Sequence, residues 1–433
     1  MEFLQSWISP PRADHVQIAK YIIIITSLFF VPYISVLFGS TLFSLGFSLR
    51  GKFEENSLFS RFSKDLVDTL YGNWGVALVL GILPLITLTI SFSQILYGTD
   101  VNIAQYFIVT LFITFAAIVL TFLYRNSFEK RDDAYWRHII LGLLALGGLK
   151  TTLFAFASTI TLVLFPERWA LIHSIIPLTF SWSVVAKFSF LMMLSLAVTG
   201  AAILFFFFSW GGGRQGMDEQ YREYVKKFGA GITLGLSIVS MLMFLWYLVT
   251  LPVMAKSYGM FLSAMVAVFV MLIVCIYAAA LLRDSQLKHA GKVFILFIVF
   301  FLVVTVNDNI ARENSLHYQN YKLDKINSEI VAKIEAESAE KSGATASVEM
   351  GKEIYNAKCI ACHRFDQKLV GPAYNDVVPK YNGDIEKLKQ FILNPVKVDP
   401  SFPMTMPNQM LKPFEAESAA MYLMDEVKKL QGN

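Results

Sequence analysis

Eight long apolar blocks constrain the fold of this chain more than any other feature of its sequence. They lie at about 18–47, 74–97, 104–124, 139–163, 184–210, 229–251, 258–282 and 293–307. A helix needs about 20 mostly apolar residues to cross the roughly 30 Å hydrocarbon layer of a membrane. Backbone polar groups in that layer must be hydrogen-bonded within the protein, which favours helices. We therefore expect an all-α protein in which residues 1–310 form a bundle of eight transmembrane helices.

The loops between these blocks predict the orientation of the bundle. Fifteen Lys and Arg residues lie in the loops after blocks one, three, five and seven, whereas the other three loops hold only Arg168 and Lys256. Cytoplasmic loops are enriched in basic residues. The N-terminus lacks the charged segment and cleavage site of a signal peptide, so the first block is expected to remain as a span. We expect a multi-pass protein of a bacterial cytoplasmic (inner) membrane, with both termini on the periplasmic side.

The composition changes after residue 310. Residues 311–347 include EIVAKIEAESAEKSGATAS, in which Glu329–Lys333 and Glu337–Lys341 are four apart in the order that favours a helix. We expect a charged helical spacer with a flexible break at 343–347; a disordered tether is the alternative. The net charge is only +4 and no basic run follows, so nucleic acid is not an expected partner.

The segment CIACH contains Cys359, Cys362 and His363, in the C-x-x-C-H spacing that attaches c-type haem. Two thiols about one helical turn apart can add to the two vinyl groups of one porphyrin, and the adjacent histidine is then held beneath the iron. A zinc site would need further ligands nearby, but no Cys or His follows His363. A redox-active dithiol would sit in a larger α/β domain. The motif therefore predicts one covalently bound haem c.

Around this motif, residues 346–433 resemble class I cytochrome c. VEMGKEIYNAKCIACH is similar to that family's N-terminal helix, with Gly351 and Tyr355 where its helices cross, and FEAESAAMYLMDEVKKL is similar to its C-terminal helix. VGPAY is similar to the loop whose proline carbonyl orients the proximal histidine. The resemblance implies that residues 348–433 form a small all-α monohaem domain. It also implies that Pro372 accepts a hydrogen bond from His363.

The sixth iron ligand is expected in FPMTMPNQM, which contains Met404, Met406 and Met410. With no histidine available, methionine is the natural donor, and Met/His ligation raises the potential of the haem. The family's ligand is usually followed by proline, as Met406 is. We therefore predict His363 and Met406 as the two iron ligands, with Met404 as the alternative. A five-coordinate iron would indicate gas or peroxide chemistry instead.

The membrane blocks hold few residues that could do redox chemistry. None of the remaining histidines lies in the middle of a block, so a second haem held by two histidines of this chain is not expected; they are His15, His138, His173, His289 and His317. Lys150 lies near the middle of the fourth block, where a charge costs about 2.5–3.5 kcal/mol. Its counter-charge could be a partner subunit, a quinone carbonyl or water, or it could snorkel. Lys187 is expected to snorkel to the outer surface.

The membrane part has its own resemblance. PLTFSWSVVAKFSFLMMLSLAVTGAAILF, with FLWYLVTLP after it, is similar to proteins related to subunit I of cytochrome bd-type quinol oxidases, some of which carry a fused c-type domain. This chain departs from the pattern at LFFVPYISVLFG in the first block, which has no histidine where those oxidases have a haem ligand. Oxygen reduction by this chain alone is therefore not expected.

These features together favour a membrane-bound monohaem cytochrome that passes single electrons, as a subunit of a respiratory oxidoreductase complex rather than a stand-alone enzyme. The expected donor is a quinol-oxidising membrane complex, and the expected acceptor is a periplasmic cytochrome or oxidase. One alternative is a bd-like quinol oxidase or quinol–cytochrome c reductase subunit with its own quinone pocket near Lys150 or the loop 164–183. Another is a transporter or sensor regulated by the redox domain.

Overall fold

The computed structural model describes residues 11–99, 103–131, 133–171, 181–283, 287, 289–341, 345–397 and 405–432. These residues are mainly helical and contain no strand, which confirms the expected all-α class. The chain divides into two compact units, Met1–Asp324 and Lys325–Asn433. Each unit is described separately below.

The first unit contains, in its described residues, eight helical stretches that are long and apolar enough to cross a membrane, as the sequence predicts. Six are α2 (Ala13–Phe53), α7 (Tyr135–Val163), α9 (Trp182–Phe208), α10 (Glu219–Thr250), α11 (Tyr258–Arg283) and α12 (Ala290–Ser315). The second span joins α4 (Trp74–Ala77), the π-helical turn η1 (Leu78–Ile82) and α5 (Leu83–Ile95), and the third joins α6 (Ile103–Asn126) and η2 (Ser127–Lys130). Short 3₁₀ turns lie between spans: η3 (Pro166–Leu171), η4 (Trp210–Gly212) and η5 (Val253–Ala255).

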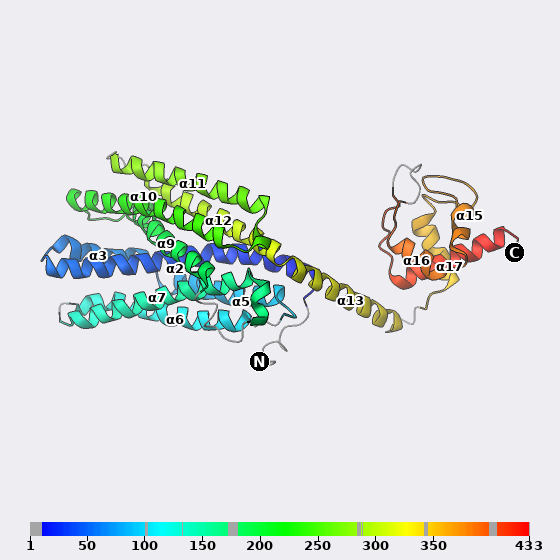
Figure 1. Ribbon diagram of the computed structural model, residues 1–433, viewed down its shortest axis with the longest axis horizontal. Coiled ribbons are helices and arrows are strands. Elements are labelled where there is room, and N and C mark those ends of the chain that lie inside the picture. The colour runs from blue at the N-terminus through cyan, green and yellow to red at the C-terminus, as the bar shows by residue number, and fades with distance from the viewer. Residues whose placement is uncertain are drawn as a thin grey trace. The chain divides into compact units, whose positions relative to one another are not determined.

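Helices α2 and α9 form the centre of this bundle. Most of each of them is buried, whereas the other six spans each leave a wide face exposed. Helix α2 contacts α5, α7, α9 and α12, and Figure 1 shows it running between the green and the cyan helices. The outer faces carry exposed apolar side chains such as Phe112, Leu143 and Phe269. Apolar faces of this extent are rare on soluble monomers and suit a lipid environment.

An amphipathic helix, α3 (Ser57–Leu70), packs against α2 between the first two spans. Its apolar side buries Phe62 and Leu66 completely. The carboxylate of Asp65 on the same helix accepts hydrogen bonds from Arg214, at 2.6 Å, and from the Tyr221 hydroxyl, at 2.7 Å. This contact fixes the glycine-rich loop between α9 and α10 at the end of the bundle where the basic loops lie.

Residues 317–341 form a helix, α13 (His317–Lys341), so this part of the expected spacer is helical. The division between the two units falls within it, after Asp324. Side chains on its surface include Lys325 and Glu329, whose charged atoms are 4.0 Å apart. This exposed pair is one turn earlier than the predicted Glu329–Lys333 pair.

The second unit is a small helical domain. Its elements are α14 (Val348–Ile354), η6 (Tyr355–Cys359), α15 (Tyr374–Val377), η7 (Val378–Tyr381), α16 (Ile385–Leu393) and α17 (Pro413–Leu430). Helices α14 and α17 pack together, and Gly351 is buried where they meet, at the position that the sequence resemblance implies. Tyr355 also lies here, with its ring 5.7 Å from that of Tyr422. This crossing holds the start of the cysteine motif against the core of the domain.

Candidate functional site

The cysteine motif begins at Cys359, the last residue of the π-helical turn η6, and forms one further turn of backbone. The amides of Cys362 and His363 both donate to the carbonyl oxygen of Cys359, at 3.1 and 3.0 Å. Cys359 and Cys362 are therefore one turn apart. Both are half-buried free thiols. This is the spacing that the attachment of one porphyrin through two thiols requires.

The imidazole of His363 is fixed by the loop that follows the motif. Its Nδ1 lies 3.0 Å from the carbonyl oxygen of Pro372. A carbonyl can only accept a hydrogen bond, so Nδ1 carries the proton and Nε2 is left with a free lone pair. The ring of Tyr374 stacks on the imidazole at a centroid distance of 5.0 Å. His363 is thus oriented as a ligand whose donor atom is Nε2.

Gly371 is part of the same loop and makes room for the imidazole. Its amide donates to the carbonyl oxygen of Cys362 at 2.9 Å. A Cβ atom at this position would lie 2.1 Å from Cε1 of His363, so any larger residue would displace the ring. The loop therefore needs glycine here to hold the histidine in place.

The chemistry of Cys359 separates haem attachment from the alternative of a redox-active dithiol. Burial raises the pKa of its thiol, and a hydrogen bond with Tyr374 opposes this only in part. Burial also raises the pKa of Tyr374, so that its hydroxyl keeps its proton. Dithiols that exchange disulfides have a lowered thiol pKa. The described residues contain no group of three or more His, Cys, Asp or Glu placed to hold a metal.

The methionine segment lies beside the motif. Lys358, which directly precedes Cys359, donates from Nζ to the carbonyl oxygen of Gln409 at 3.0 Å. Met406, three residues before Gln409, is half-buried in the non-helical segment ahead of α17. Met410 is 88% exposed, so its side chain is free of the domain core. Met404 lies outside the described residues, and ligation by Met406 stays a prediction.

Lys187 of the membrane unit does not snorkel, and the prediction that it would is wrong. Its side chain is buried, and Nζ lies 2.5 Å from Oδ2 of Asp308. The sequence pattern placed the end of the last span at residue 307, one residue before this carboxylate. Helix α12 continues to Ser315, because the polar residues that follow keep their helical hydrogen bonds. Asp308 and Arg312, four apart on α12, are charged residues of the bundle that the pattern missed.

Two other candidate residues of the membrane unit, Lys150 and His138, differ from each other in their surroundings. Lys150 is exposed near the middle of α7. His138 is buried, with its Nδ1 2.6 Å from the Ser127 hydroxyl and its Nε2 3.2 Å from the Ser48 hydroxyl. Both ring nitrogens are therefore engaged within the protein. His173 lies outside the described residues.

Comparison with known proteins identifies relatives of the C-terminal part. The family model for cytochrome c matches residues 348–425. Cytochrome c-551 of Pseudomonas denitrificans is 38% identical over 77 residues, which are 17% of this chain and 93% of that protein. Cytochrome c-551 of Pseudomonas aeruginosa is 35% identical over 74 residues, 16% of this chain and 70% of that protein. Cytochrome c-551 of Azotobacter vinelandii is 50% identical over 36 residues, 8% of this chain and 44% of that protein.

Proposed function

This chain belongs to the cytochrome c family through its C-terminal unit, and from that membership we propose that it is a membrane-bound monohaem cytochrome of a respiratory complex. It passes single electrons from a quinol-oxidising membrane complex to a haem protein outside the membrane. The observation that carries the proposal is the hydrogen bond from Nδ1 of His363 to Pro372 within a C-x-x-C-H turn. This contact orients His363 as a ligand for the cofactor.

The residues of the site fit a covalently bound haem c. Cys359 and Cys362 offer two thiols one turn apart, and His363 offers a free Nε2. Haem c supplies reversible one-electron exchange when it is bound. The Pro372 carbonyl orients the imidazole, as hydrogen-bonded partners of metal ligands do. Gly371 leaves the space that this orientation needs.

Met406 is proposed as the second iron ligand. Support comes from the hydrogen bond between Lys358 and Gln409, which holds the methionine segment next to the turn that carries the cysteines. Asn408 also donates to the carbonyl oxygen of Leu393 at 3.1 Å, which ties the segment to the end of α16. An anchored thioether would keep the iron six-coordinate, so that it exchanges electrons and does not bind substrates. The exposed apolar side chains of Leu369 and Val370, close after the motif, suit brief docking of an electron acceptor.

We propose that the haem-bearing unit lies on the periplasmic side of a bacterial inner membrane. The support is the concentration of basic residues in alternate loops, which favours a cytoplasmic position for those loops. An even number of spans then returns the chain to the side where it began. Haem is attached to c-type apoproteins outside the cytoplasmic membrane, so the chemistry of the motif requires this same side.

We propose further that other membrane subunits of the complex bind this bundle and carry the quinol site. The support is Lys150, which is exposed near the middle of α7 and has no ion pair or hydrogen bond with any residue that the structure describes. A lysine at that depth needs a counter-charge or a polar partner. Leu143 and Leu144, also exposed, extend the same outer side of the helix. A membrane subunit with an acidic side chain at this depth would satisfy Lys150.

The experiment that tests this function compares the purified chain with membranes that hold the whole complex. A pyridine haemochrome spectrum should give one haem c per chain, and a reduced-minus-oxidised spectrum should show no b- or d-type haem in the isolated chain. Quinol should reduce the haem in the membranes but not in the isolated chain. Reduction of the isolated chain by quinol would instead favour a quinone pocket in this chain. Absence of thioether-linked haem would overturn the proposal.

A further inference from the structure

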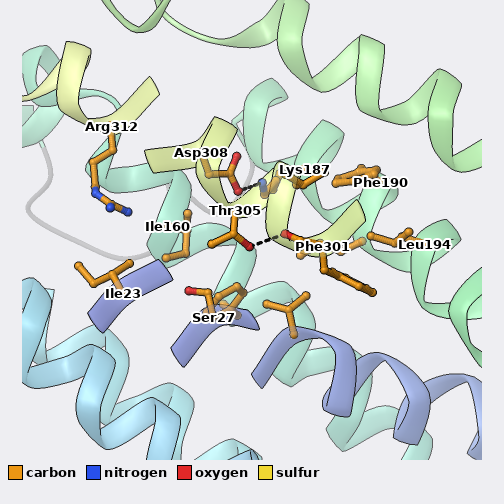
Figure 2. Close-up of a pocket in the computed structure, with 14 residues that line it drawn as sticks. Ile23, Ser27, Ile160, Lys187, Phe190, Leu194, Phe301, Thr305, Asp308 and Arg312 are labelled. Carbon is orange, nitrogen blue, oxygen red and sulfur yellow. Dashed lines mark hydrogen bonds and ion pairs between the residues drawn. The ribbon is translucent and has the colours of Figure 1, made fainter. Parts of the chain in front are cut away.

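A small cavity with a charged wall lies within the membrane unit. It is formed by the N-terminal parts of α2 and α9 and the C-terminal parts of α7 and α12. Figure 2 shows Lys187, Asp308 and Arg312 on its wall, together with apolar side chains such as Ile23, Ile160 and Leu194. The cavity volume is about 40 Å³. Charged side chains are rare inside a membrane bundle and mark functional sites by default.

Two of the three charges neutralise each other. Nζ of Lys187 lies 2.5 Å from Oδ2 of Asp308, and the Tyr247 hydroxyl donates to Oδ1 of Asp308 at 3.1 Å. The lysine ammonium also lies 4.2 Å from the centroid of the Tyr247 ring. Both ions of this pair are thus provided with partners by the protein.

Arg312 has no such ion pair within the described part of the chain, and its guanidinium carbon lies 5.3 Å from the centroid of the Phe92 ring. It is 96% buried, since only 4% of its surface is exposed, and one of its Nη groups donates to Oδ1 of Asn309. Its Nε–H has no hydrogen-bond partner among the residues that the structure describes. Figure 2 shows the guanidinium on the side of the cavity near Ile23 and Ile160, apart from the Lys187–Asp308 pair. The next carboxylate along the helix, Glu313, is already held by Lys20 at 2.6 Å.

The charges around the cavity do not balance. Lys20 offsets Glu313 and Lys187 offsets Asp308, which leaves the charge of Arg312 in surplus. A guanidinium does not lose its proton in proteins. A buried charge that no opposite charge compensates is strongly destabilising. An anion next to Nε would remove the surplus and satisfy the free donor.

The size of the cavity limits what that anion can be. One water needs about 10–15 Å³ of such space, so about 40 Å³ holds roughly three waters or one monatomic anion. A lipid phosphate or a quinone ring is much larger. We propose that this cavity binds a small monovalent anion of the size of chloride, held by Nε of Arg312. The anion joins α12 to α2 and α7 at this end of the bundle.

Binding of an anion to the surplus charge of Arg312 can be tested directly with the full chain in detergent. The thermal midpoint of the membrane unit is measured by tryptophan fluorescence while sodium chloride replaces sodium gluconate at constant ionic strength. A ligand that binds the folded state raises the midpoint as its concentration rises through its dissociation constant. We expect a saturating rise with chloride and with bromide in the wild-type protein.

Four variants separate this site from other effects of salt. Arg312→Gln and Lys187→Gln each remove the surplus charge and should abolish the response. Asp308→Asn adds a second surplus charge and should tighten chloride binding at least ~10-fold. The double variant Lys187→Gln/Asp308→Asn loses the ion pair but keeps one surplus charge, so it should still respond. If Arg312→Gln does not fold, the contrast between Lys187→Gln and the double variant still tests the proposal.

Bromide in crystals of the full chain locates the ion by anomalous scattering. Bromide density next to Nε of Arg312 is the expected result. A wild-type midpoint that does not depend on halide would overturn the proposal. A response that persists in Arg312→Gln, or is lost in the double variant, would also overturn it. None of these results depends on the haem or on electron transfer.

Discussion

Gly351 of α14 lies so close to Ser418 of α17 that a Cβ atom at position 351 would be 2.0 Å from the Ser418 carbonyl oxygen. The obstacle is backbone, which cannot rotate away as a flexible side chain does. Gly351→Ala should therefore separate the two helices and destabilise the haem unit by about 3 kcal/mol, as overpacking does. Guanidinium unfolding followed by haem absorbance measures this. Lys352→Ala, at the exposed neighbouring position, should change stability by less than about 0.5 kcal/mol. Equal midpoints for the two variants would contradict the described crossing.

The contact between Gly371 and His363 predicts an effect on the iron rather than on folding alone. In Gly371→Ala the new Cβ would meet the imidazole and displace it from the Pro372 carbonyl. We expect a haem that stays covalently attached but shows a weakened histidine ligand in its absorption spectrum, with a changed midpoint potential. Val370→Ala, at the exposed preceding residue, is the control and should leave the spectrum unchanged. A Gly371→Ala protein that is merely less stable, with a normal spectrum, would refute this role of the glycine.

Replacement of the methionines tests the sixth ligand. Met406→Ala should lower the midpoint potential by ~0.1 V or more, within the ~0.8 V range that axial ligands span, because Met/His ligation favours the reduced iron. The absorption band that reports a sulfur ligand should disappear as well. Met410→Ala is the matched control, since its side chain is 88% exposed. Loss of the band in Met404→Ala, with Met406→Ala unaffected, would transfer the assignment to Met404.

Much of the fold can be predicted from the sequence, because the length of an apolar block decides whether it can span a membrane. The eight blocks correspond to eight helical spans in the part of the chain that the structure describes, and C-x-x-C-H places the attachment turn without further information. The ends of the spans are less predictable, since a helix continues through polar residues for as long as its backbone remains hydrogen-bonded. Asp308 and Arg312 were missed for this reason, and Lys187 was misinterpreted because the apolar pattern ends one residue before its partner, Asp308.

The finer features of the haem site depend on contacts between distant residues. The hydrogen bond from Tyr374 to the Cys359 thiol and the one from Lys358 to Gln409 join residues 15 and 51 positions apart. No spacing rule predicts which side chains meet after such loops close. The His363–Pro372 contact was expected only because the loop resembles that of a known family. Sequence patterns therefore find the ligands, whereas the structure shows what holds them.

Lys389 predicts a stability that depends on alkaline pH. Its ammonium lies 2.9 Å from Glu386 and 3.1 Å from Glu417, which joins α16 to α17. The hydrogen bond to Glu386 raises the pKa of Lys389 in the folded protein. A raised lysine pKa contributes stability that is complete below the ordinary value of about 10.4 and is lost as the pH rises through the raised value. Both glutamates are partly exposed, so the contribution is at most about 1 kcal/mol.

The measurement for Lys389 is denaturant unfolding of the haem unit at a series of pH values. Lys389→Met should lower stability at pH 7 by up to about 1 kcal/mol and should flatten the fall in stability above pH 10. Lys387→Met, at an exposed position on the same helix, serves as the control and should retain the wild-type pH profile. An unchanged alkaline profile in Lys389→Met would show that another group causes the dependence.

Lys150 predicts opposite effects on the isolated chain and on the complex. Removal of a charge near the middle of α7 saves about 2.5–3.5 kcal/mol of insertion cost, so Lys150→Met should stabilise the isolated chain. In the complex the same change would leave a partner's acidic group buried without a counter-ion, so the partner should dissociate. Native gel electrophoresis of solubilised membranes measures this, with Thr151→Val at the exposed neighbouring residue as the control. A second copy of this chain cannot be that partner through this face, because two Lys150 ammonium groups would then meet. An intact complex in Lys150→Met would show that Lys150 has no acidic partner.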